Sequence, residues 1–274
     1  MTARDGVVYD LPEEEYHAPK DELSSTGAKL LLDSPAKFKH SFLDSNRVHK
    51  KAWDLGTVVH AKVLGVGWEV RELDFENYRT KAAQEARDET REAGLVPMLK
   101  HELAGAYAVA EAVLANPTAR KLLEYESSPE VSVFSTCPET GVRLRARFDR
   151  LTDDRPLAID LKTTAGSAAA TEFARTIHNF GYDVQEAQYG DTLLYATGRD
   201  VEMVFIVVET AAPFLVNTIM IPQVWREMGR AKSMEARRRF RHGIDTGEWP
   251  GYSPEIKRPE PPMFAVYDYQ DNYA

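Results

Sequence analysis

The chain has 274 residues, of which 43% are hydrophobic and 28% are charged, as is typical of a globular protein. No apolar run approaches the length of a membrane span, and the acidic N-terminus has no signal-peptide core. The single cysteine, Cys137, excludes an internal disulfide and a four-cysteine zinc or iron–sulfur site, and it fits a reducing cytoplasm. A formal net charge of −9 argues against a general polyanion-binding surface, so any nucleic acid would need a local basic patch.

The first half of the chain is predicted to be helical. Residues 1–50 form an irregular extension with one helix, which Ser25 or Thr26 caps and Pro35 limits. Apolar or alternating charged residues at helical spacing predict further helices over residues 52–64, 80–93 and 98–124. The last of these should break near Pro117.

At Glu130 the pattern changes to alternation with a period of two. It predicts an antiparallel meander of three strands over residues 130–136, 142–151 and 157–163. A helical region broken near Gly181, two strands and a last helix follow, over residues 171–197, 201–209, 214–221 and 222–243. This order predicts an α/β fold, a mixed central sheet flanked by helices with a helical N-terminal extension. We expect one compact domain overall, with an extension (1–50), a core domain (51–247) and a proline-rich tail (248–274) that drapes over the surface.

The third predicted strand carries Asp160 and Lys162 two residues apart, so both side chains share one face. Asp149 ends the strand before it, and Glu130 opens the first strand. Two acids on neighbouring strands beside an Asp-x-Lys pair would hold Mg²⁺ and orient a water for phosphodiester hydrolysis. For Asp160 and Lys162 taken alone, the alternative is an ordinary solvated ion pair.

Glu130, Asp149 and Asp160-x-Lys162 together resemble the core of the PD-(D/E)XK nuclease superfamily. Two helical pairs resemble the histidine and Gln-x-x-x-Tyr motifs of its RecB-like branch, namely Gly56-x-x-x-His60 and Gln185-x-x-x-Tyr189. The spacings and the flanking sequences SSTGAKLLLDSPAKF and GEWPGY are most similar to the exonuclease VIII group, the RecE-type enzymes of phages and prophages. The resemblance covers roughly residues 20–255.

This resemblance implies a role for each residue. Mg²⁺, with Mn²⁺ as a substitute, would be held by His60, Asp149, Asp160 and the backbone carbonyl of Leu161, and Glu130 would hold a second metal or its waters. Lys162 would lower the pKa of the attacking water or stabilise charge on the phosphate. Gln185 and Tyr189 would position the scissile phosphate or order the metal shell. The alternatives are a structural His60, a surface Gln185, a core Tyr189, and Glu124 or Glu126 in place of Glu130.

Two basic stretches are candidates for DNA contact. Arg143, Arg145 and Arg147 alternate along the strand that ends at Asp149, which would suit a track for phosphates. The last predicted helix is strongly basic and would line a DNA channel through residues such as Arg237, Arg238 and Arg239. Solvated faces are the alternative in both places.

The resemblance further implies an exodeoxyribonuclease that degrades linear double-stranded DNA from 5′ to 3′ and leaves 3′ tails for recombination by strand annealing. Its expected partners are a RecT-type annealing protein and further copies of itself, with a tetrameric ring as one arrangement. No phosphate-binding loop of a motor ATPase is present. The rival interpretations are an endonuclease or nuclease module of a repair or restriction complex, and a non-catalytic DNA-binding protein of the same fold.

Overall fold

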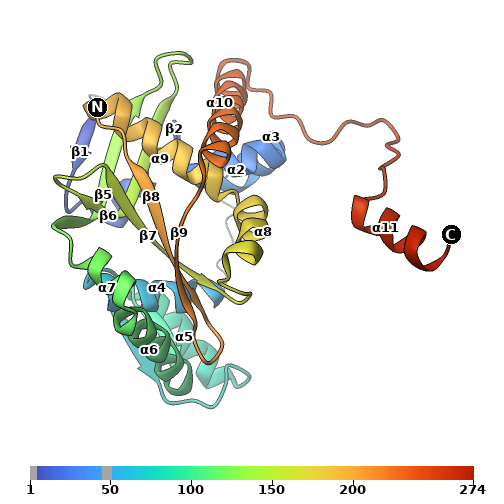
Figure 1. Cartoon of the computed structure of the whole chain (residues 1–274). Helices are drawn as coiled ribbons and strands as arrows, with labels where there is room; N and C mark the ends of the chain where they lie inside the picture. Colours follow the sequence, from blue (N-terminus) through green and yellow to red (C-terminus); the bar gives the residue numbers. More distant parts are fainter. Residues whose placement is uncertain (1–4, 45–50) are drawn as a thin grey trace.

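The computed structural model describes residues 5–44 and 51–274, and it is built around a mixed β-sheet (Figure 1). The strands in this sheet follow the order β1-β5-β6-β7-β8-β9, with β2 paired to β6. Their bounds are β1 (Gly6–Val8), β2 (Glu22–Leu23), β5 (Ser127–Thr136), β6 (Arg143–Thr152), β7 (Leu157–Thr164), β8 (Glu202–Glu209) and β9 (Val216–Met220). The pairs β7–β8 and β2–β6 are parallel and the others antiparallel, which confirms the predicted mixed sheet and its three-stranded meander.

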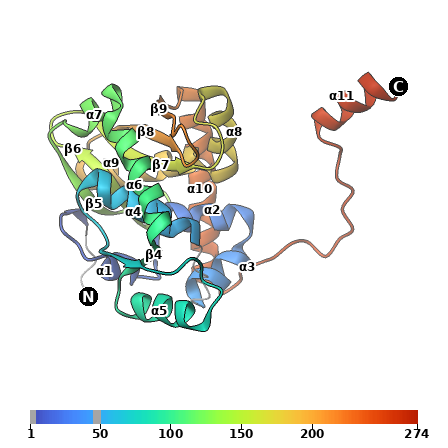
Figure 2. The same ribbon diagram turned by 90° about the horizontal axis from the view of Figure 1, so that it is seen from below.

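Helices cover both faces of this sheet, as Figures 1 and 2 show. The N-terminal half contributes α1 (Glu13–His17), α2 (Ser25–Asp33), α3 (Pro35–Phe38), the π-helix η1 (Lys39–Leu43), α4 (Lys51–Leu64), α5 (Lys81–Glu92), α6 (Lys100–Ala115) and α7 (Pro117–Leu123). The C-terminal half contributes α8 (Ala170–Phe180), α9 (Tyr182–Thr197), α10 (Gln223–Thr246) and α11 (Met263–Asn272). A second, small parallel sheet joins β3 (Val70–Leu73) to β4 (Val96–Leu99).

The alternation of strand residues divides the core into two layers. Ile159 and Leu161 of β7 pack toward α4 and α6 in a cluster with the valines of those helices. Ala158, together with Phe205 of β8, packs on the opposite face against α8 and α9. Asp160 therefore belongs to the α9 face, because side chains two apart on a strand point the same way.

Most predicted helices are present, but some boundaries and short elements were wrong or missed. Ser24, rather than Ser25 or Thr26, caps α2, because its extended backbone lets its hydroxyl accept from the Gly27 N–H at 3.2 Å. The break at Gly181 is confirmed, with φ of 62°. Residues 96–99 pair with β3 instead of starting a helix, and the sequence did not predict β1 to β4, α1 or α11.

The tail does not drape over the surface as predicted. Trp249 stacks on Phe38, and the Ala36 N–H donates to the Pro250 carbonyl, so the chain is held as far as this point. The chain then leads away from the body to α11, none of whose residues is buried (Figure 1). Among the described helices, none combines the length and the apolar character that crossing a membrane requires.

Candidate active site

The site lies where the central sheet splits. Along one edge of β6, β2 pairs with Arg143 and Leu144, whereas β7 pairs only with Arg150 and Leu151. Between these points β6 and β7 diverge. The Asp149 carboxylate spans the opening and accepts the Leu161 N–H at 2.8 Å through Oδ2. We call this opening between β6 and β7 the fork. It brings Asp149, near the end of β6, into contact with Leu161, in the middle of β7.

On the other edge of β6, the pairing with β5 is interrupted at Glu130 of β5, which lies opposite Asp149. The β5–β6 ladder pairs Pro129 with Arg150 and Val131 with Phe148, but the pair between them is missing. Glu130 has φ of 49°, a left-handed conformation that costs a non-glycine residue on the order of 1 kcal/mol. Burial, and then the Asp149 charge, raise the pKa of Glu130 to about 7. Glu130 lines the cleft, whereas Glu124 caps the end of α7, so Glu130 is the better candidate for the third acid.

His60 joins α4 to this fork. Its Nε2 lies 3.0 Å from Asp149 Oδ2 and 3.1 Å from the carbonyl oxygen of Leu161. Burial alone would lower the pKa of His60, but the Asp149 carboxylate outweighs it and raises the pKa to about 9. The protonated ring therefore bridges two oxygens that the sequence predicted to be metal ligands. Burial alone would raise the pKa of Asp149, but the effect of His60 is opposite, and the pKa of Asp149 is lowered overall.

Asp160 and Lys162 form a buried ion pair and not a solvated one. Lys162 Nζ lies 2.5 Å from Asp160 Oδ2, and Asp160 is only 1% exposed. Gln185 Nε2 donates to the other oxygen, Oδ1, at 2.7 Å. Burial raises the pKa of Asp160, with Lys162 opposing it. Burial works against the charge of Lys162, but Asp160 and Asp149 hold its pKa above the ordinary value, so it remains an ammonium.

The helix α9 places three further polar side chains beside the fork or behind it. Tyr189 packs edge-on against Phe148, with ring centroids 5.1 Å apart, and burial raises its pKa well above the ordinary value. The centroid of the Tyr182 ring lies 5.1 Å from Lys162 Nζ and 5.3 Å from Lys29 Nζ, and burial lowers the pKa of Lys29 to about 7. Gln188 instead is buried and donates to the Leu23 carbonyl, a structural contact.

The three arginines of β6 do share one face, but they hold the N-terminal segment. Arg145, which is 2% exposed, donates to the carbonyls of Tyr16 and Pro19 at 2.8 Å each, so its predicted contact with phosphate is wrong. Arg143 pairs with Asp5 and with Glu22.

Arg147 is different, because it also lines the cleft. It donates to the Leu11 carbonyl at 2.8 Å, and its Nε lies 4.0 Å from Glu130 Oε2. Among the three arginines, Arg147 is therefore the one that still suits a phosphate contact.

The basic residues of α10 mainly neutralise acids rather than form an open patch. Arg237 is completely buried and lies 2.8 Å from Asp191, so its predicted DNA contact is wrong. Arg239 pairs with Glu235 and donates to the Leu31 and Leu32 carbonyls. Arg238 is exposed and stays a candidate. Other pairs join α10 to α9, namely Arg226 with Glu186, Arg230 with Asp191 and Lys232 with Asp183.

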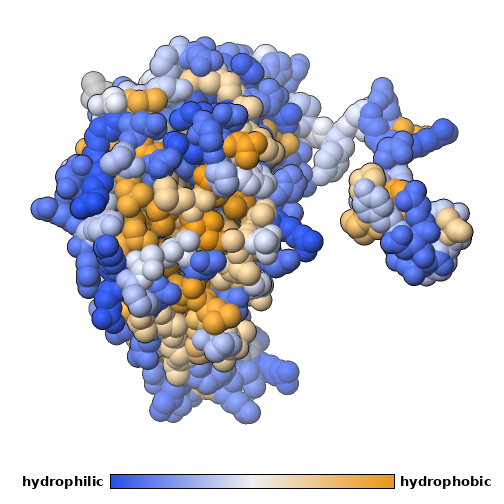
Figure 3. All heavy atoms as spheres, viewed as in Figure 1, coloured by the Kyte–Doolittle hydropathy of each residue, from blue (hydrophilic) through white to orange (hydrophobic). Residues whose placement is uncertain are grey.

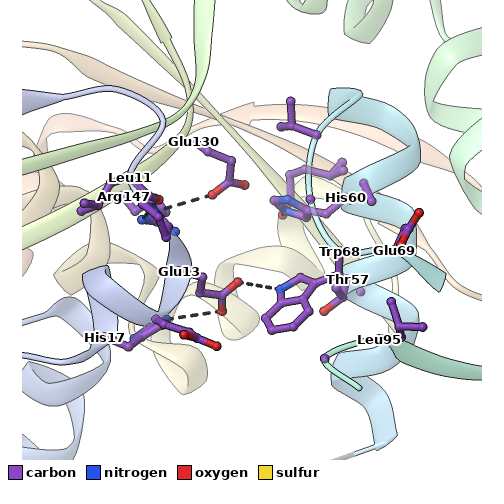
Figure 4. Close-up of a pocket in the computed structure, with 18 of the residues that line it drawn as sticks. Leu11, Glu13, His17, Thr57, His60, Trp68, Glu69, Leu95, Glu130 and Arg147 are labelled. Carbon is purple, nitrogen blue, oxygen red and sulfur yellow. Dashed lines mark hydrogen bonds and ion pairs between the residues drawn. The ribbon is translucent and has the colours of Figure 1, made fainter. Parts of the chain in front are cut away.

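A cleft of about 940 Å³ leads to the fork and is lined by residues from distant parts of the chain (Figure 4). The predicted His60, Glu130, Leu161 and Lys162 line it, and Arg147 lies on its wall. Sequence reasoning missed further lining residues, namely Glu13, His17, Thr57 and Trp68. No motif or period marks these residues, because they come from the extension, from α4 and from the loop after it.

The donor set suits a hard divalent cation. The Asp149 carboxylate, the Leu161 carbonyl and the His60 imidazole meet at the fork, with the Asp160 carboxylate on the neighbouring residue, and oxygen donors are those that Mg²⁺ prefers. Within the described residues, no three His, Cys, Asp or Glu side chains already form a metal cluster. The reason is visible in the contacts: Asp160 is turned to Lys162 and Gln185, and His60 bridges Asp149 and Leu161. These residues would fit a metal only if Asp160 and His60 exchanged their present partners for it.

The split sheet, with acids on its two arms beside an Asp-x-Lys pair, is a PD-(D/E)XK fold. The chain belongs to the family described as PDDEXK-like domain of unknown function (DUF3799), which matches residues 24–258.

One solved structure with a TM-score above 0.5 supports the fold. A protein assigned as an exonuclease from Eubacterium rectale has a TM-score of 0.63 at 14% identity, covering 94% of this chain and 98% of its own. A phage related exonuclease from Haemophilus somnus 129PT (TM-score 0.34, 13% identity, 83% and 96% covered) and an alkaline exonuclease from Laribacter hongkongensis (0.29, 13%, 72% and 95%) are more distant. No curated protein matched the chain.

Proposed function

We propose that this protein is a divalent-metal-dependent exodeoxyribonuclease that digests linear double-stranded DNA. The observation that carries the proposal is the fork itself, where His60 Nε2 lies within 3.1 Å of both the Asp149 carboxylate and the Leu161 carbonyl oxygen, beside the Asp160–Lys162 pair. The family and the fold agree with a nuclease.

Each residue at the fork has a separate role in the proposed reaction. Asp149, Asp160, the Leu161 carbonyl and His60 would hold Mg²⁺ or Mn²⁺, and Glu130 would hold a second ion or its waters. A bound metal supplies charge stabilisation for the phosphoryl group and a more acidic water. Lys162, kept as an ammonium by Asp160 and Asp149, would stabilise negative charge on the phosphate. Gln185 fixes the orientation of Asp160, and Tyr189 stands on the cleft side of the same helix.

The finer parts of the proposal rest on the sequence resemblance. Digestion runs from 5′ to 3′ and leaves 3′ single-stranded tails for recombination by strand annealing, beside a RecT-type partner in the cytoplasm. The protein acts as a homo-oligomer, with a ring as the arrangement that would enclose DNA. Exposed apolar side chains at the two ends of β9 and at the start of α10, namely Leu215, Met220 and Val224, suit contact with a second copy. Figure 3 shows apolar side chains gathered over the middle of this face.

A time course on linear duplex DNA labelled at either the 5′ or the 3′ end tests the proposal. With Mg²⁺ we expect early release of the 5′ label and a lasting 3′ strand, and no release with EDTA. Asp160→Asn should lose at least about 99% of the rate, because a lost metal ligand removes several kcal/mol of transition-state stabilisation. A folded wild-type protein that releases no label with Mg²⁺ or Mn²⁺ would contradict the nuclease proposal, and early 3′ release would contradict the polarity.

A further inference from the structure

Residues 11–17 form an arch that lines one wall of the cleft, and this arch is fixed at both ends. On its N-terminal side, β1 pairs with β5, and Arg147 of β6 holds the Leu11 carbonyl. On its C-terminal side, β2 pairs with β6, and the buried Arg145 holds the Tyr16 and Pro19 carbonyls. Because strand pairing and charged donors secure both ends, the arch keeps its position over the site.

A hydrogen bond joins this arch to the opposite wall. Trp68 Nε1 donates to Glu13 Oε2 at 2.6 Å, and His17 Nε2 lies 3.5 Å from Glu13 Oε1 (Figure 4). The hydrogen bond from His17 lowers the pKa of Glu13, so the acceptor is an ionised carboxylate. Such a charge-assisted bond is stronger than one between neutral groups.

Trp68 belongs to a loop that is pressed against the helix carrying His60. The loop leaves α4 through Gly65 and Gly67, whose φ values are 74° and 131°. A Cβ on Gly67 would lie 3.2 Å from the Cβ of Ala61, so only glycine allows this close approach. The Trp68 side chain is therefore placed by the same helix that carries His60.

These contacts close a circuit around the cleft. It runs from Glu13 to Trp68, through α4 to His60, on to Asp149 and Arg147 of β6, and back through Leu11 to Glu13. Two cavities meet at this circuit. The cavity of about 940 Å³ reaches Lys162 and Tyr182, and one of about 710 Å³ reaches Ser24, Ser25 and Tyr189. Both cavities are lined by Glu13, His17, Thr57, Trp68, Glu130 and Arg147.

We propose that the Glu13–Trp68 bridge turns the cleft into a passage through which a DNA strand must be threaded by a free end. The bridge is then the element that restricts cleavage to DNA with ends. Each cavity has a volume in the range of small-molecule sites, so we take one strand, and not a duplex, as the occupant. Trp68 is 39% exposed, so its ring is also free to stack on a base of the threaded strand.

The proposal rests on the proposed nuclease function, and its test compares one plasmid in two forms. A negatively supercoiled closed circle, which exposes unpaired strands but has no end, is incubated with Mg²⁺ beside the same plasmid made linear. We expect the wild type to digest only the linear form. Glu13→Ala and Trp68→Ala should each raise the ratio of circle nicking to linear digestion at least tenfold.

Glu13→Gln is the matched control, because its amide oxygen still accepts the Trp68 N–H and should preserve the preference for ends. Both side chains of the bridge are partly exposed, so Glu13→Ala and Trp68→Ala should fold. The ratio measured with either variant alone is enough to test the bridge proposal. An unchanged ratio in the folded alanine variants, or a wild type that nicks circles as fast as it digests linear DNA, would overturn the bridge proposal. A wild type that digests neither form would instead contradict the nuclease function.

Discussion

At the scale of single residues, the buried charges of the fork are mutually dependent. Asp160 has almost no contact with solvent, so the ion pair with Lys162 and the hydrogen bond from Gln185 replace the lost hydration of its carboxylate. An unpaired buried carboxylate is costly, whereas replacing both members of a buried pair is often nearly neutral. The fork therefore makes a prediction about stability that is separate from its predictions about catalysis.

Lys162→Met should abolish turnover and also lower the free energy of unfolding by roughly 3 kcal/mol, because Asp160 loses its cation. The double variant Asp160→Asn with Lys162→Met should recover most of that loss. Urea unfolding of the three variants without metal measures the coupling between the two residues. Equal destabilisation in the single and the double variants would show that the Asp160 charge is compensated elsewhere.

A second buried acid, Glu186 on α9, gives the molecule a predicted pH dependence. Burial raises the pKa of Glu186 to about 7, although Arg226 and the Met203 N–H oppose it. A raised pKa means that protonation favours the folded state, so this stability is present below about pH 4.5 and is lost as the pH rises through about 7. Glu186→Gln should therefore lose less in Tm than the wild type between pH 5 and pH 8. The exposed Glu111→Gln is the control, and a curve parallel to the wild type for Glu186→Gln would refute the assignment.

At the scale of elements, α9 and α10 form a charged pair that lies unusually close. A Cβ placed on Gly229 of α10 would lie 2.2 Å from the Asp183 carbonyl oxygen of α9, so the backbones nearly touch there. The salt bridges between these helices depend on that approach. This arrangement explains why the basic character of α10 misled the sequence analysis: the acids that neutralise it are on another helix.

Gly229→Ala should lower Tm by more than about 5 °C, since the added methyl must force the two helices apart. Gly105→Ala in α6 is the matched control, because nothing lies within 4 Å of its Cβ position. That control should be neutral or should raise stability by about 0.5 kcal/mol through the better helix propensity of alanine. Thermal unfolding of both variants checks the pair, and equal Tm values would contradict the close helix contact.

At the scale of the whole molecule, the sequence could predict what depends on local periodicity. The meander, the helices around it and the shared face of Asp160 and Lys162 follow from spacing alone, and the structure confirms them. It could not predict that Arg145 and Arg237 are buried, because their carbonyl and carboxylate partners are distant in sequence. The sequence also could not predict that the arch and Trp68 line the site, because they contact it only through residues distant in sequence. The roles of the site residues themselves stay predictions.

The C-terminal tail separates into a part that belongs to the core and a part that does not. Trp249 stacks on Phe38 with centroids 5.4 Å apart and meets Phe240 edge-on, whereas the residues of α11 are all outside the core. A chain that ends at Ser253 should therefore unfold at the same Tm as the whole chain. Trp249→Ala in the whole chain should instead cost roughly 2–4 kcal/mol, the range for removing a large aromatic side chain that is partly buried. Urea unfolding of the two proteins measures the contrast. A clear loss of stability on removing residues 254–274 would mean that α11 packs on the body in solution.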